Sequence, residues 1–320
     1  MGRLFFRYNN NKIAYYLINY LRPYIPRNLY RARLKKVLGK IRNYDREYVY
    51  GRVNYYNKLT TVTKLSDQAT ALGEFKLLKK YKTYSFDSYE HIRYFDPLLR
   101  VRFIFGDITT VPGEPSILKS RPAEGENSNS ILLKLNKIRH YIYIRDRMSF
   151  SKKKDMLVFR GTRKQEHRIR FMQMYRDHPM CDVGTFMIDK TDNSLYKGWM
   201  SKKKQLEYKF ILCLEGFDVS SNLKWVMSSN SIAVMPKPKY ETWFMEGTLI
   251  PDYHYILIKD DYSDLEEKMR YYISHQDEAL RIIRNANEYM DQFRNQKRED
   301  LISLMVLKKY FEMTGQKVVL

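Results

Sequence analysis

Strands that alternate with helices over residues 155 to 260 constrain the fold of this chain more than any other feature. Compact β-prone runs, DMLVFRG (155–161), FILCLEGFD (210–218) and SIAVMP (231–236), are separated by segments with helical spacing. This alternation predicts a doubly wound parallel sheet, an α/β fold. From Asp264 onward the helical spacing continues, which predicts a helical tail.

The first half of the chain has a less regular pattern. Residues 72–82 (LGEFKLLKKYK) have the spacing of an amphipathic helix, and residues 131–139 also have helical spacing. Three short runs, YEHIRYF (89–95), RVRFIFG (100–106) and YIYIRD (141–146), are rich in β-prone residues. We expect these three to be strands.

The charge of the chain predicts an anionic partner. Its 58 Lys and Arg against 36 Asp and Glu give a formal net charge of +22. Nucleic acid, an anionic membrane surface and phosphorylated substrates all fit that charge. The N-terminal arm, residues 1–41, mixes basic residues with aromatic ones such as Phe5, Phe6, Tyr16 and Tyr24. The arm is expected either to rest among lipid headgroups or to pack as a helix with a solvated basic face.

Two turns of the expected sheet carry residues suited to phosphate. Ser220, Ser221 and Asn222 follow the strand at 210–218, and LVFRGTRK (157–164) ends another strand. Small hydroxyl and amide side chains let backbone N–H groups approach phosphate oxygens, and arginine offers a planar fork of donors. Ordinary helix capping by Ser and Asn is the alternative. Two such turns predict a bound nucleotide diphosphate, and neither GxxxxGK[ST] nor GxGxxG occurs.

These residues also carry a family resemblance. The blocks are FGDITTVPGEPSILKSRP, NSILLKLNKIRHY, LVFRGT, EGFDVSSNLKWVMSSNSIAVMP and ETWFMEGTLIPDYHYILIKDDYSDL, with the helix after them. In this order, over roughly residues 95–295, the chain resembles glycosyltransferase family 90, and most of all its bacterial lipopolysaccharide-core branch. The resemblance implies a GT-B fold, with two Rossmann-like domains facing a cleft, and inverting, metal-independent transfer from a nucleotide sugar, expected to be UDP-linked.

The resemblance also implies a donor site without a metal. No Asp-x-Asp motif occurs, so cations are expected to stabilise the leaving diphosphate. Eukaryotic protein O-glucosyltransferases place an arginine where this chain has Asn222, which shifts that role toward Arg160 and Lys224. The expected donor-binding residues are Arg160, Gly161, Thr162, Arg163, Asp218, Ser220, Ser221, Asn222 and Lys224.

Asp107 is the expected catalytic base. The resemblance places the base at an aspartate followed five residues later by a proline, here Asp107 and Pro112. In an inverting displacement one carboxylate suffices, because it takes the proton of the acceptor hydroxyl as the new bond forms. The alternative is an aspartate that only caps a turn.

Relatives contact the acceptor through a loop that corresponds here to LKSRP. The expected acceptor-binding residues are Lys119, Ser120, Arg121, Asn129, Trp243 and Glu246. For Lys119 and Arg121 the alternative is a solvated basic rim. For Trp243 it is an aromatic ring packed under a loop.

The expected domains are a basic helical region (1–82), an acceptor-side Rossmann-like domain (83–154), a donor domain (155–295) and a C-terminal helix (296–320) that packs back on the N-terminal domain. We expect a peripheral enzyme at the cytoplasmic face of a bacterial inner membrane that adds a sugar to lipopolysaccharide core or a similar lipid-linked glycan, with no cofactor. The alternatives are a nucleic-acid-binding protein, for which no motif is present, and an inactive membrane-associated scaffold with the same fold.

Overall fold

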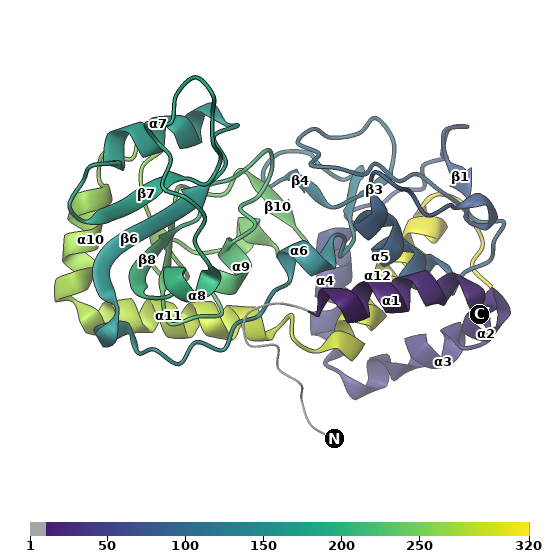
Figure 1. The fold of residues 1–320 in the computed structure, drawn as a ribbon. Helices are drawn as coiled ribbons and strands as arrows, with labels where there is room; N and C mark the ends of the chain where they lie inside the picture. Colours follow the sequence, from purple (N-terminus) through teal and green to yellow (C-terminus); the bar gives the residue numbers. More distant parts are fainter. Residues whose placement is uncertain (1–10, 320) are drawn as a thin grey trace. The chain divides into compact units, whose positions relative to one another are not determined.

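The computed structural model of the chain describes residues 11–319, which form two compact units (Figure 1). Of these residues, unit 1 contains 140–238 and 248–292, and unit 2 contains 11–139, 239–247 and 293–319. Phe5 and Phe6 of the predicted arm lie outside the described residues.

Unit 1 is built on a five-stranded sheet in which every neighbouring pair is parallel. The strands are β6 (Lys154–Gly161), β7 (Cys181–Thr185), β8 (Tyr208–Leu212), β9 (Ile232–Met235) and β11 (Ile256–Leu257). Their spatial order is β11-β9-β8-β6-β7. The chain therefore winds outward in both directions from the centre of the sheet, and the predicted doubly wound α/β arrangement is confirmed for this unit.

Helices cover the sheet of unit 1 because a parallel sheet has two apolar faces. The helices are α7 (Glu166–Tyr175), α8 (Lys202–Gln205), α9 (Leu223–Val226), α10 (Leu265–Ser274) and α11 (Gln276–Asp291). Figure 1 shows α7, α10 and α11 around the sheet. Their apolar residues join Leu157, Phe210 and Val234 in one core. Val158 and Ile211, which alternate with these core residues along the strands, are fully buried too.

Unit 2 is mainly helical. Its helices are α1 (Lys12–Leu21), α2 (Arg27–Arg31), α3 (Leu34–Leu38), α4 (Arg46–Tyr56), α5 (Lys82–Ile92) and α12 (Gln296–Met313), with 3-10 turns η1 (Arg22–Tyr24), η2 (Gly39–Asn43) and η3 (Leu72–Glu74). The C-terminal helix α12 packs against α3, α4 and α5. Two short elements, α6 (Lys137–His140) and η5 (Glu246–Thr248), lie where the chain passes between units, and η4 (Phe150–Lys152) precedes β6.

The strands of unit 2 are short and paired in twos. They are β1 (Thr70–Ala71) with β2 (Arg100–Val101), β3 (Ser116–Leu118) with β5 (Ser130–Leu132), and β4 (Ser120–Pro122) with β10 (Tyr240–Thr242). Within its described residues, this unit therefore lacks the extended parallel sheet that a second Rossmann-like domain would contain.

Several predicted elements in the first half of the chain are wrong. Residues 89–95 were expected to form a strand, but most of them belong to helix α5, which is buried on nearly every side and so shows no helical period. Residues 72–82 contain only the turn η3 before α5 begins. Of residues 100–106, only Arg100 and Val101 form a strand, β2, and Phe103 forms an isolated β-bridge with Ile117. Residues 141–146 contain no regular strand, and 131–139 begin in β5 before the short helix α6.

The units also differ from the predicted domain ranges. Strand β10 pairs with β4, so residues 239–247 belong to unit 2 and interrupt the predicted donor range. Residues 140–154 belong to unit 1. Over residues 11–319, the helices are all too short or too polar to cross a bilayer.

Candidate functional site

The carboxyl ends of β6 and β8 are where the topology of unit 1 predicts a ligand site. These two strands are neighbours at the centre of the sheet, and the chain leaves them toward opposite edges. Ligands of such sheets bind in the crevice at the carboxyl ends of the strands where the winding direction changes. The two turns predicted to bind the donor follow exactly these two strands, at Gly161 and after Leu212.

Arg168 of α7 links the two turns. Its Nη1 donates to Thr162 Oγ1 at 3.1 Å, its Nε to the carbonyl oxygen of Glu215 at 2.8 Å and its Nη2 to that of Leu214 at 2.7 Å. The turns after β6 and β8 are thus in direct contact through one side chain. Sequence reasoning missed Arg168, because one basic residue in a basic helix carries no signal by itself.

The second turn is held by its own polar side chains. Asn222 Nδ2 donates to the carbonyl oxygen of Leu212 at 2.9 Å, and the Ser220 hydroxyl donates to Asn222 Oδ1. Asn222 does not cap α9 with its side chain, so the capping alternative is wrong for this residue. Helix α9 has four residues, which makes its dipole a smaller feature of the turn than the sequence predicts.

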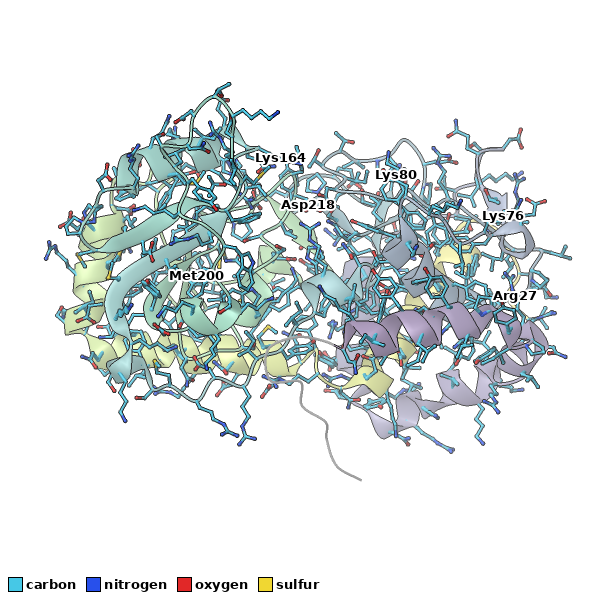
Figure 2. All side chains as sticks on the ribbon, in the orientation of Figure 1. Arg27, Lys76, Lys80, Lys164, Met200 and Asp218 are labelled. Carbon is cyan, nitrogen blue, oxygen red and sulfur yellow. The ribbon has the colours of Figure 1, made fainter. Side chains whose placement is uncertain are left out.

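Other predicted donor residues surround this turn. Asp218 and Ser220 are each 3% exposed and Lys224 is fully buried, while Ser221 is partly exposed. Figure 2 labels Asp218 in this turn and Lys164 in the turn after β6. Burial raises the pKa of the Cys213 thiol, and the positive charge of Lys224 opposes that rise.

The two predicted arginines near the end of β6, Arg160 within the strand and Arg163 after it, already have acidic partners. Arg160 Nη2 lies 2.6 Å from Asp182 Oδ1, and its Nη1 donates to the Asp182 carbonyl oxygen at 2.8 Å. Burial raises the pKa of Asp182, but bonds from Tyr208 and Arg160 bring that pKa below its ordinary value. Arg163 lies 3.5 Å from Asp189 and 3.6 Å from Asp192. A direct contact of either arginine with a diphosphate stays a prediction.

Asp107 of unit 2 is presented by a turn that needs glycine. Gly106 has φ +129°, a conformation that disfavours residues with a Cβ. Lys119 Nζ lies 2.5 Å from Asp107 Oδ1, and the Tyr84 hydroxyl donates to the same oxygen at 3.3 Å. Burial alone would raise the pKa of Asp107, but Lys119, with help from Arg139 and Tyr84, holds that pKa below its ordinary value. The carboxylate is therefore ionised at neutral pH and able to accept a proton.

Three residues predicted to touch the acceptor also hold the segment from Asp107 to Pro112, and their contact with an acceptor stays a prediction. The Ser120 hydroxyl donates to the carbonyl oxygen of Ile108 at 3.1 Å. Asn129 Nδ2 donates to that of Pro112 at 3.1 Å. Together with the Lys119 contact, these bonds fix both ends of the segment.

Lys119 and Arg121 do not form a solvated rim. Their exposed fractions are 2% and 0%. Arg121 donates from Nε to Glu241 at 2.8 Å, from Nη1 to the Ser130 carbonyl oxygen at 3.1 Å and from Nη2 to that of Tyr55 at 2.7 Å. These partners enclose the guanidinium, so Arg121 is part of the packed interior of unit 2.

Trp243 and Glu246 lie in the interior of unit 2. Trp243 is fully buried, stacks on Tyr56 with ring centroids 3.8 Å apart, and donates from Nε1 to Glu299 at 2.6 Å. The structure therefore favours the alternative of aromatic packing over stacking on a sugar. The Glu246 carboxylate accepts from the backbone N–H of Thr242 at 2.6 Å and so closes a local turn. Over residues 11–319, no three His, Cys, Asp or Glu side chains cluster in a way that would hold a metal ion.

Comparison with known proteins identifies the family. Residues 132–319 match glycosyl transferase family 90. The chain is 42% identical over 268 residues to the O-glucosyltransferase LpsA of Dichelobacter nodosus. The aligned residues make up 84% of this chain and 84% of LpsA. It is 26% identical over 175 residues to protein O-glucosyltransferase 3 of Homo sapiens, 53% of this chain and 34% of the human protein. The same protein of Rattus norvegicus matches over the same length with the same identity.

The family match spans the sheet of unit 1, the turns after β6 and β8, and helix α12, and the LpsA match covers most of the chain. The protein therefore belongs to glycosyl transferase family 90, and it is a glycosyltransferase.

Proposed function

We propose that the protein transfers glucose from UDP-glucose to a hydroxyl group of a lipid-linked surface glycan such as lipopolysaccharide core. Family membership supports the transfer of a sugar. The choice of glucose rests on the names of the relatives, which are O-glucosyltransferases. The name LpsA supports a lipopolysaccharide acceptor.

The observation that carries the donor side is the Arg168 link between the turns after β6 and β8. It places Gly161, Thr162 and the Leu214–Asn222 segment together at the winding change of a parallel sheet. In the proposal, backbone N–H groups of both turns bind the diphosphate, as helix and turn N–H groups do in other nucleotide sites. Lys224, Arg163 and Arg160 supply positive charge, the two arginines by exchanging an aspartate partner for phosphate.

The proposed reaction is a single displacement with inversion. The acceptor oxygen attacks the anomeric carbon as the bond from that carbon to the β-phosphate oxygen breaks, and UDP leaves with the electron pair. Asp107 accepts the proton of the acceptor hydroxyl. Lys119 and Tyr84 keep the carboxylate ionised and oriented for that step. The positive side chains balance the charge of the leaving UDP, so the proposed chemistry needs no metal.

The proposal assigns donor binding to unit 1 and the catalytic base to unit 2. A GT-B enzyme likewise has one donor-binding domain and one acceptor-side domain. The proposal also places the enzyme at the inner face of a bacterial inner membrane, where a lipid-linked acceptor is available. The net charge of +22 is consistent with a phosphorylated acceptor in that setting.

A test of the proposal uses the pure, full-length protein in the presence of a chelator. We expect UDP-glucose to raise the melting temperature and UDP to be released slowly, with the release accelerated by lipopolysaccharide core. UDP-galactose and GDP-mannose are the matched controls for the sugar and the nucleotide. If no nucleotide sugar raised the melting temperature while single-stranded RNA did, the proposed function would be wrong.

A further inference from the structure

Helix α1 turns apolar side chains toward solvent. Ile13, Leu17 and Leu21 are 82%, 58% and 55% exposed. Residues four apart lie on the same face of a helix, so these three form one apolar row along α1. Ile18 is 54% exposed beside it. A helix of a globular domain normally buries such a face.

Two polar side chains of α1, those of Tyr15 and Asn19, face the interior instead. The Tyr15 hydroxyl donates to Asp87 Oδ1 at 2.8 Å, and Arg22, directly after the helix, pairs with Glu90 at 2.8 Å. Asn19 is 4% exposed. These buried polar contacts hold the helix in this orientation, so the outward apolar row is a consequence of how α1 is anchored.

The apolar surface continues after α1. Tyr24, Ile25 and Leu29 are 84%, 41% and 52% exposed. We call the exposed apolar and aromatic residues of the segment the N-terminal apolar surface; they are Ile13, Leu17, Ile18, Tyr20, Leu21, Tyr24, Ile25 and Leu29. A surface of this kind marks an interaction site.

The charge of the same segment is uniformly positive. Residues 11–43 contain nine Lys or Arg and no Asp or Glu. Six of the basic residues are exposed and form no ion pair with any residue that the structure describes; they are Lys12, Arg33, Lys35, Lys36, Lys40 and Arg42. Apolar residues beside unpaired cations are typical of segments that lie in the headgroup layer of anionic membranes.

We propose that the N-terminal apolar surface inserts into the headgroup layer of a bilayer rich in anionic phospholipid. A second copy of the chain is a poorer occupant, because pairing two such surfaces would bring together like charges with no acidic residue in the segment to offset them. An anionic bilayer would bury the apolar side chains and bring lipid phosphates to the basic residues. The inference uses none of the residues assigned to glycosyl transfer.

The test is flotation of the full-length protein with vesicles. We expect binding to phosphatidylglycerol–phosphatidylethanolamine vesicles and little binding to phosphatidylcholine vesicles. The double variant Leu17→Ser, Leu21→Ser should weaken binding by at least about tenfold, because two apolar side chains no longer enter the bilayer. Leu98→Ser is the matched control, since Leu98 is 83% exposed and lies outside the segment. A Leu17→Trp variant should show a blue shift of fluorescence with the anionic vesicles.

Three results would overturn the proposal. One is equal binding of the wild type and the double variant to anionic vesicles. Another is a dimer in light scattering that the double variant abolishes, which would show that a second copy covers the surface. The third is vesicle binding that appears only after deletion of residues 1–10. Stabilisation by UDP-glucose should be unchanged in the double variant, so failure here is separable from failure of the proposed function.

Discussion

At the scale of single residues, the contact between Asp107 and Lys119 governs the proposed chemistry. The lysine is 2% exposed, whereas the aspartate side chain is 28% exposed. A buried cation therefore holds a carboxylate that solvent or an acceptor can reach. The pair orients the base and keeps it ionised, at the cost of making it a weaker base.

Asp107→Asn should separate binding from catalysis. The amide keeps the size of the side chain but cannot accept the acceptor proton, so transfer should fall by about 10²–10⁴-fold. The affinity for UDP-glucose, measured by calorimetry, should stay within about twofold because the donor residues are in unit 1. Asp67→Asn, at a fully exposed aspartate of the same unit, is the control. Unchanged turnover in Asp107→Asn would remove Asp107 from this role.

Lys119→Met should change the pH profile of transfer. In the wild type the pKa of Asp107 lies below its ordinary value of 3.8. Activity should therefore be flat from about pH 5 to 7, since the carboxylate is already ionised. Without the ammonium, burial should raise the pKa, and the loss of activity on acidification should begin at higher pH. A variant with lower activity but the wild-type pH profile would show that Lys119 does not act through the ionisation of Asp107.

At this scale the sequence predicted some site features and not others. It identified Ser220 and Asn222 as members of one polar turn, and the structure joins them by a hydrogen bond. It did not foresee that Arg121 and Trp243 are buried. Arginine and tryptophan occur both in binding sites and in packed interiors, and their surroundings come from segments that are distant in the sequence.

At the scale of elements, the strand-to-helix turns of unit 1 were the most predictable part. Strands β6, β8 and β9 overlap the runs 155–161, 210–218 and 231–236, which the sequence marks as apolar and β-prone. Such runs are reliable because both faces of a parallel strand are buried. Unit 2 was less predictable, because its strands have two or three residues and its helix α5 is buried almost all round.

Gly161→Ala should destabilise unit 1. A Cβ at this position would lie 2.3 Å from Cζ of the Phe159 ring, which is 4% exposed and packed in the core. Accommodating it should cost about 1–3 kcal/mol in the free energy of unfolding. Denaturant unfolding measures that cost. Gly216→Ala is the control, because its nearest neighbour would be at an ordinary 3.5 Å. Equal stability of the two variants would contradict the close packing of Gly161 against the Phe159 ring.

At the scale of the whole molecule, the chain passes between the two units several times. Residues 239–247 return to unit 2 before the last strand of unit 1, β11, and residues 293–319 return after it. They bring Glu241 to Arg121 and Trp243 to Tyr56. The sequence predicted that the C-terminal helix packs back on the N-terminal part of the chain. It did not predict the return of residues 239–247, because the pairing of β10 with β4 spans 120 positions between Arg121 and Glu241.

A fragment of residues 11–139 should therefore fail to fold by itself. It would leave the buried Arg121 without Glu241, and loss of one member of a buried ion pair costs about 3–5 kcal/mol. It would also lack α12. We expect weak near-ultraviolet circular dichroism and no cooperative transition in denaturant, in contrast to the full chain. A sharp transition in the fragment would show that its interior does not need the returning segments.

The most direct measurement of the central claim is hydrogen exchange of the full-length protein with UDP-glucose and a chelator. If the diphosphate binds the turns after β6 and β8 without a metal, exchange should slow in peptides covering residues 161–168 and 214–224. Protection confined to unit 2, or protection that appears only when a divalent metal is added, would contradict it.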